Sequence, residues 1–180
     1  SPRADNLMLR LVTFDDTLNE VHGFRPLAQC DVDTYTGCIE PGGTTALYDA
    51  ACNVTGSVTQ YGKDLQDNDY VVNAIVFVIT DGEDNASAMT ANEVKKSLAE
   101  AVQSEALESI RSVLIGVNVQ DQRMSRYLAD LHQNGGFSQY VEIGAANEKS
   151  LARLAEFVSK SISAQSQSLG SGGPSQALTF

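Results

Sequence analysis

The chain has 180 residues, of which 42% are hydrophobic and 19% charged, a composition typical of a globular domain with one substantial core. Its formal net charge of −11 argues against nucleic-acid binding, because phosphate recognition needs clustered Lys and Arg and only 12 are spread along the chain. No apolar run reaches the roughly 18 residues that a membrane-spanning helix needs. The acidity suits divalent cations or a basic partner, and a solvated acidic surface explains it equally well.

Two glycines and two threonines, Gly42-Gly43-Thr44-Thr45, lead directly into a helical pattern. Apolar residues then recur at spacings of three and four, which predicts an amphipathic helix: Leu47, Ala51, Val54, Val58, Tyr61 and Leu65. Thr44 and Thr45 are therefore expected in the loop or at the N-cap. Taken alone, the segment is explained by a glycine turn with a threonine cap. The functional interpretation is a hydroxyl directed at a ligand.

A continuous apolar run over residues 75–80 stops on the acidic turn Asp81-Gly82-Glu83-Asp84-Asn85. A run without polar alternation predicts a strand covered on both faces, which is typical of a central parallel strand in a layered α/β domain. Ligands bind at the carboxyl ends of such strands, where Asp81 lies. The order of the two segments favours a functional role for both. Glu83, Asp84 and Asn85 either extend an acidic rim or begin a solvated loop.

Helices and strands continue to alternate after Asp81, which predicts a parallel sheet with crossover helices. Thr90-Ala91-Asn92-Glu93 is a capping box that should begin the next helix. The later pattern predicts a strand over 112–119, a helix stopped by Asn134-Gly135-Gly136, a strand over 140–143 and a helix over 151–162. Residues 164–180, rich in Ser, Gln and Gly, are expected to form a linker or docking tail whose apolar part is 177–180.

The two loops give the chain a resemblance to the von Willebrand factor A domain, a three-layer, Rossmann-like α/β module with a mostly parallel sheet. Residues 42–47 are similar to the second metal loop of that family and residues 77–82 to the third, within a domain that spans 1–163. The resemblance implies a metal-ion-dependent adhesion site. Thr44 and Asp81 would be metal ligands there. The rim of that site would comprise Gly43, Thr45, Gly82 and Glu83.

The first metal loop of the family, Asp-x-Ser-x-Ser, has no match in this chain. Residues 1–6 resemble the turn that leaves a first helix, and residues 7–14 the second strand. The resemblance therefore implies that a strand between 7–14 and 75–80, with the main metal ligands, comes from upstream of Ser1 or from another polypeptide. Thr44 and Asp81 alone would not hold Mg²⁺ against its hydration shell, so we expect half a site.

We expect a binding module rather than an enzyme. Mg²⁺, or Mn²⁺ or Ca²⁺, would trade a water for the carboxylate of a protein partner. By analogy with compact bacterial members of the family, that partner is a ring-shaped ATPase or another subunit of a bacterial complex. One alternative is a scaffold subunit with no functional metal site. Another is a hydrolase that uses Asp81, although the sequence shows no phosphate loop or nucleophile elbow to support it.

The remaining candidate residues are two histidines and three cysteines. His22 and His132 are expected at the surface. The spacing of Cys30 and Cys38 would allow a disulfide, but we expect three reduced thiols, with Cys52 buried on a helix. Reduced thiols favour a cytoplasmic location, and an extracellular one stays open because residues upstream of Ser1 would carry any signal peptide.

Overall fold

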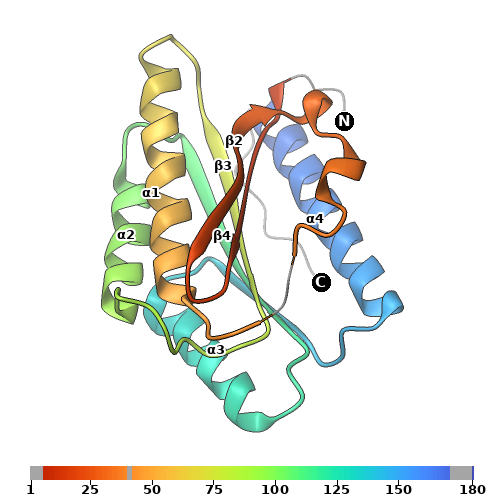
Figure 1. The fold of residues 1–180 in the computed structure, drawn as a ribbon. Coiled ribbons are helices and arrows are strands. Elements are labelled where there is room, and N and C mark those ends of the chain that lie inside the picture. The colour runs from red at the N-terminus through yellow and green to blue at the C-terminus, as the bar shows by residue number, and fades with distance from the viewer. Residues whose placement is uncertain (1–5, 40–41, 171–179) are drawn as a thin grey trace.

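The computed structural model describes residues 6–39, 42–170 and 180 and shows an α/β fold, with a parallel sheet between layers of helices (Figure 1). The sheet has three strands in the order β3 (Asn73–Thr80), β4 (Ser109–Val117) and β5 (Gln139–Ile143). Both pairings are parallel, as the alternation of helices and strands predicts. No helix in the described ranges is long and apolar enough to cross a membrane.

Four helices cover the two faces of this sheet (Figure 1). Helices α1 (Leu47–Gln66), α2 (Ala91–Gln103) and α3 (Gln122–Gly135) pack on one face, around the completely buried Leu114. Helix α4 (Glu148–Gly170) packs on the other face, where Ile115 is equally buried. Val76, Phe77 and Val78 of β3 therefore pack against helices on both faces of the sheet, which explains why the sequence of β3 lacks polar alternation.

Strand β3 lies at an edge of the three-stranded sheet, although its apolar run predicts a central strand. Val76 and Val78 face the core shared with α1, α2 and α3, while Phe77 packs against the cluster beneath α4. An apolar run indicates that both faces of a strand are covered, but it does not indicate how many of the strand's two edges are paired with other strands. Within the described residues β4 is the central strand, and no strand pairs with the other edge of β3.

The helix boundaries confirm some of the local signals and correct others. Thr90 and Glu93 form the predicted capping box at the start of α2, and Gly136, with φ of 81°, ends α3 in the left-handed region. Helix α1 has Ala46 as its N-cap, without a side-chain bond, so the threonine-cap interpretation is wrong. The physical reason lies in the 81–87 loop, described below.

Helix α4 continues to Gly170, into the segment expected to be a tail. Gln165 is buried there and its Nε2 donates to Ser109 Oγ at 3.3 Å, which ties this part of the helix to the sheet. The predicted turn over residues 1–6 and most of the tail fall on 1–5 and 171–179, outside the described residues.

An antiparallel hairpin forms a second, two-stranded sheet from β1 (Met8–Phe14) and β2 (Leu18–Pro26). Strand β2 was not predicted, because its polar and glycine-bearing sequence lacks a clear apolar alternation. Two short 3-10 helices, η2 (Leu27–Gln29) and η3 (Val32–Tyr35), follow it.

The expectation that both histidines lie at the surface is wrong for His22. His22 is 5% exposed, with Nε2 at 2.9 Å from the Tyr35 hydroxyl and Nδ1 at 2.7 Å from the Gly23 carbonyl. Two hydrogen-bond partners let the imidazole ring be buried at little cost, and a single strand pattern could not reveal them.

The three cysteines are free in the structure, as expected. Cys52 lies on α1 and is half-buried rather than fully buried. Cys52 packs against the main core, and burial is the main cause that raises the pKa of its thiol.

Helix α1 joins the hairpin to the parallel sheet. The rings of Phe24 and Tyr61 stack with their centroids 4.2 Å apart, and Arg10 Nη2 donates to Asn53 Oδ1 at 3.1 Å. Phe14 packs against the core that α1 shares with β3 and β4. Strands β1 and β3 are thus held by the same helix, although they are not paired with one another.

Leu114→Ala tests the main core. Leu114 is completely buried, so the substitution should lower the free energy of unfolding by about 2–5 kcal/mol through lost burial and a cavity. Val102→Ala is the control, because Val102 is 66% exposed on α2 and its truncation should cost less than about 0.5 kcal/mol. Denaturant titration measures both, and similar losses in the two variants would contradict this packing.

Candidate functional site

The Gly-Thr loop, residues 42–46, and the acidic loop, residues 81–87, meet at the carboxyl end of β3. The Thr45 backbone N–H donates to Asn85 Oδ1 at 2.6 Å, and the Thr45 carbonyl accepts from the Asn85 N–H at 3.0 Å. The Ala86 N–H donates to the same carbonyl at 3.3 Å. Two segments far apart in the sequence are therefore fixed against one another by backbone bonds.

Gly82 packs directly against Thr45. A Cβ at Gly82 would lie 2.7 Å from Thr45 Oγ1, so a larger residue would collide with it. Thr80 Oγ1 holds the turn by accepting from the Gly82 N–H at 3.1 Å and donating to the Gly82 carbonyl at 3.0 Å. Thr45 and Gly82 thus pack the junction between the loops, whereas Gly43, with φ of 70°, shapes the exposed turn before it.

The acidic loop caps the amino end of α1. The Tyr48 N–H donates to Asp84 Oδ1 at 3.2 Å and to Ser87 Oγ at 3.0 Å, and the Asp49 N–H donates to Ser87 Oγ at 3.0 Å. A helix leaves its first N–H groups without internal partners and carries a partial positive charge at that end. The Asp84 carboxylate stabilises α1 both by accepting a hydrogen bond from one of these groups and by its negative charge. This cap from a distant loop explains why Ala46 needs no capping side chain.

The bonds between loop and helix run in both directions. The Asp49 carboxylate accepts from the Ala88 N–H at 3.1 Å and from the Met89 N–H at 2.7 Å. The Asp84 N–H donates to the Tyr127 hydroxyl at 3.0 Å, which in turn donates to the Tyr48 hydroxyl at 2.7 Å. Burial, followed by the bond to Tyr48, raises the pKa of the Tyr127 hydroxyl. Sequence reasoning missed the structural roles of Asp49, Tyr48 and Tyr127 in these bonds.

Glu83 is engaged with α3. Arg123 donates to it through Nε at 2.9 Å and Nη2 at 2.7 Å, and this bidentate pair raises the pKa of the Arg123 guanidinium. Glu83 is a predicted rim residue of the metal site. Its carboxylate ties the acidic loop to the first turn of α3.

Strand β1 ends beside the same loops. The Asp15 carbonyl accepts from the Ala46 N–H at 2.6 Å, which places the turn after β1 next to the Gly-Thr loop. The Asp15 carboxylate accepts from the Thr17 N–H at 3.0 Å, and that bond is the main cause that lowers the pKa of Asp15. The sequence reasoning did not single out Asp15, because no motif marks this turn.

Thr44 and Asp81 are the two uncommitted side chains of this junction. Both are exposed, and neither makes a hydrogen bond or an ion pair to another residue that the structure describes. Their hydroxyl and carboxylate oxygens are hard ligands of the kind that Mg²⁺, Mn²⁺ and Ca²⁺ take. Among the described residues, however, no group of three or more His, Cys, Asp and Glu side chains is placed to hold a metal ion. Any such ion would need ligands beyond Thr44 and Asp81.

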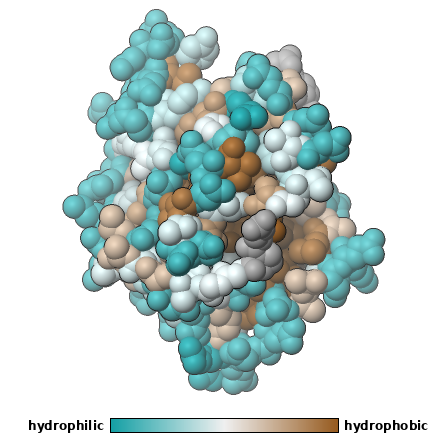
Figure 2. All heavy atoms as spheres, in the orientation of Figure 1, coloured by the Kyte–Doolittle hydropathy of each residue, from teal (hydrophilic) through white to brown (hydrophobic). Residues whose placement is uncertain are grey.

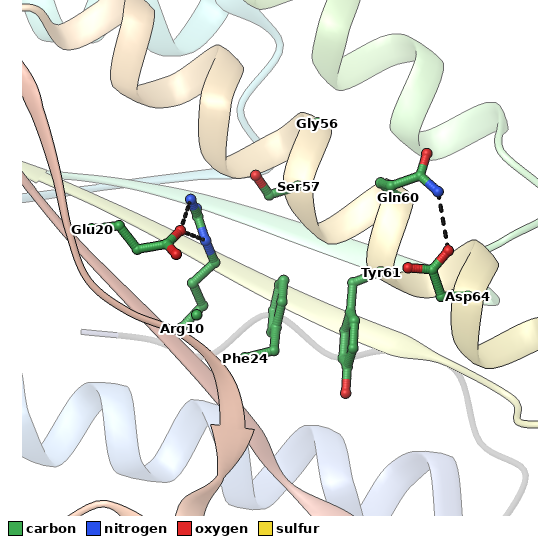
Figure 3. A pocket seen from close by; sticks show the side chains of 9 residues that line it. Arg10, Glu20, Phe24, Gly56, Ser57, Gln60, Tyr61 and Asp64 are labelled. Atoms are coloured by element: carbon green, nitrogen blue, oxygen red, sulfur yellow. Dashed lines mark hydrogen bonds and ion pairs between the residues drawn. The ribbon is translucent and has the colours of Figure 1, made fainter.

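A hollow lies between the hairpin and α1 (Figure 3). It has a volume of about 450 Å³ and is lined by Arg10, Glu20, Phe24 and Tyr61, among others. Figure 3 shows the two aromatic rings face to face, with Arg10 turned toward Glu20, whose Oε2 accepts from Arg10 Nε at 2.8 Å. Glu20 balances the charge of Arg10, whose Nη1 is buried without a hydrogen-bond partner among the described residues.

Comparison with known proteins identifies no family for this chain. No protein-family model matches it, and no curated protein matches it. The geometry of the residues therefore carries the functional argument.

Gly82→Ala tests the contact between the two loops. The new methyl group would lie 2.7 Å from Thr45 Oγ1, so the variant should lose about 1–3 kcal/mol of unfolding free energy. Adding Thr45→Ala removes that oxygen and should recover part of the loss. Gly42→Ala is the control, because a Cβ at Gly42 meets nothing within 4 Å. Thermal unfolding of these three variants and of Thr45→Ala alone measures the losses. A loss in the double variant equal to the sum of the losses in Gly82→Ala and Thr45→Ala would contradict the contact.

Proposed function

We propose that this chain is a protein-binding module that recruits its partner through a divalent cation, with Thr44 and Asp81 supplying part of the coordination. The main support for the proposal is the difference between two sets of side chains at the loop junction. The side chains of Thr44 and Asp81 are exposed and make no hydrogen bond or ion pair to another described residue. Their neighbours are engaged in hydrogen bonds, an ion pair or packing: Asp84, Asn85, Thr45 and Glu83. A rigid junction that presents free oxygens suits a site that exchanges ligands.

The cation would be a hard one, most simply Mg²⁺. Such an ion prefers octahedral oxygen coordination and keeps several waters, one of which a carboxylate of the partner would replace. Chemistry of this kind needs no nucleophile or general base, so we propose binding rather than catalysis. The formal charge of −11 is consistent with attraction of cations to the chain.

The other ligands would come from a strand seated between β1 and β3. Both strands pack on α1, both end beside the Gly-Thr loop, and they are not paired with each other. We infer that an extended segment, from upstream of Ser1 or from another polypeptide, pairs with β3 and ends near Asp81. The fold would then correspond to a von Willebrand factor A domain of the compact intracellular type, and its partner to a ring-shaped ATPase or another subunit of a bacterial complex.

A scaffold role without a metal is the second candidate. It is favoured by the structural use of Asp84, which caps α1, and of Glu83, which pairs with Arg123. In that case the Gly-Thr and Asp-Gly turns serve only to join α1 to β3. Metal titration separates the two candidates, because a scaffold without the site would bind no cation even when the adjoining strand is present.

Asp81→Ala tests the ligand assignment, in protein that includes the strand paired with β3. The unchanged protein should bind Mn²⁺ weakly to moderately, and the variant should bind at least about tenfold more weakly, because a direct or water-mediated carboxylate contact is lost. Thr44→Ala should also weaken binding. The free energy of unfolding should stay within about 0.5 kcal/mol, because Asp81 is exposed. Calorimetric titration measures the affinity.

Asp67→Ala is the matched control for that titration. Asp67 is an exposed aspartate at the C-cap of α1, far from the amino end that the loops surround. Its removal changes the net charge as Asp81→Ala does. Equal Mn²⁺ affinities for Asp81→Ala and the unchanged protein would refute the assignment of Asp81 as a ligand. Equal losses of affinity in Asp81→Ala and Asp67→Ala would refute it too, because the change in net charge would then explain both.

The edge of β3 that pairs with no described strand gives a separate prediction. Residues 1–180 alone should self-associate, because the apolar strand β3 presents unpaired backbone donors and acceptors along one edge beside apolar side chains. Ile79→Lys, on the 43% exposed Ile79 of β3, should reduce the association, since a charge on an edge strand disfavours pairing. Val102→Lys on α2 is the control and should not. Light scattering measures the mass, and a stable monomer of the unchanged chain would argue against the open edge.

A further inference from the structure

The face of the sheet beneath α4 carries a second apolar cluster. Its buried members are Val113, Ile115, Val141, Ile143, Leu154 and Phe157. Phe77 of β3 and Val158 of α4 are partly buried and pack against it. Figure 2 shows hydrophobic side chains gathered around a hollow on the side of the molecule between the hairpin and α4. Helix α4 alone therefore does not cover this face completely.

Phe180 packs against this cluster, although it is far from it in sequence. Its ring meets that of Phe157 edge to face, with the centroids 5.6 Å apart and an angle of 79° between the planes. Arg153 Cζ lies 4.9 Å from the centroid of the Phe180 ring. Phe180 is thereby half-buried, in contact with an aromatic ring and a cation together.

Arg153 and Phe157 are four residues apart on α4, so they lie on the same face of the helix, one turn from each other. Phe157 is 5% exposed and fixed by the core, whereas the Arg153 side chain projects from an exposed position. A ring placed against both gains an edge-to-face contact and a cation–π contact, which an aliphatic side chain would not. Arg153 and Phe157 thus form a binding site, called the seat below, that is selective for an aromatic ring.

We infer that Arg153, Phe157 and the adjoining cluster form a docking site for an aromatic side chain, which Phe180 of the same chain fills. The docked ring adds apolar cover to the α4 face of the sheet, where Phe77 of β3 packs against the same cluster. The seat uses neither Thr44 nor Asp81, so this inference does not depend on the proposed cation. A peptide that carries residues 172–180 should enter the seat when Phe180 is removed.

The test is the binding of a fluorescein-labelled peptide of residues 172–180 to the full chain, measured by fluorescence anisotropy. The peptide should bind the Phe180→Ala variant at least about tenfold more tightly than the unchanged chain, whose own Phe180 competes. A peptide with Ala in place of the final Phe should not bind. Equal affinities of the labelled peptide for the variant and the unchanged chain would overturn the inference.

Two substitutions on α4 sharpen the result. Adding Arg153→Ala to the Phe180→Ala variant should weaken peptide binding about two- to fivefold through loss of the cation–π contact. Lys149→Ala removes a positive charge one turn earlier on the same helix and should leave the affinity unchanged. Equal losses from the two substitutions would overturn the aromatic seat and leave only a charge effect.

If Phe180→Ala does not fold, nuclear magnetic resonance of the unchanged chain provides the test. Nuclear Overhauser effects between the ring protons of Phe157 and Phe180 should be present within one molecule. Their absence would overturn the docking. Their appearance only between differently labelled molecules would overturn the assignment to the same chain, because the ring would then come from a second copy.

Discussion

The amino end of α1 depends on hydrogen bonds that its own sequence does not supply. Asp84 and Ser87, from the loop after β3, accept the N–H groups of Tyr48 and Asp49. Free N–H groups at a buried helix end are costly, so this cap fixes where α1 begins relative to the carboxyl end of β3. Because α1 also holds the hairpin through the Phe24–Tyr61 stack, the cap positions β1 as well.

The cap also decides which side chains remain available for function. A carboxylate at a helix amino end is stabilised by the helix dipole, and Asp84 occupies that place. Asn85 holds the backbone of Thr45, and Gly82 leaves room for the Thr45 side chain. Thr44 and Asp81 stay outside the network, which is why the proposed function rests on them.

The sequence predicted well what short-range chemistry determines. The capping box at Thr90, the left-handed glycine at Gly136 and the apolar strands each depend on neighbours in the chain, and the structure confirms them. What it could not predict depends on distant partners. The burial of His22 requires the Tyr35 hydroxyl, and the missing cap on Ala46 requires Asp84. Apolar patterning could not indicate that β3 lies at an edge of the described sheet, since it records covered faces and not paired edges, and only the resemblance implied an absent neighbouring strand.

Hydrogen exchange in β3 tests the central claim, an open strand edge beside Asp81, most directly. In a parallel pair the N–H groups of alternate residues point to opposite sides, so every second amide of β3 faces away from β4. The account predicts fast exchange for those amides and slow exchange for their neighbours and for β4, with uniform protection once a strand pairs with β3. Amides of β3 as uniformly protected as those of β4 in residues 1–180 alone would contradict it.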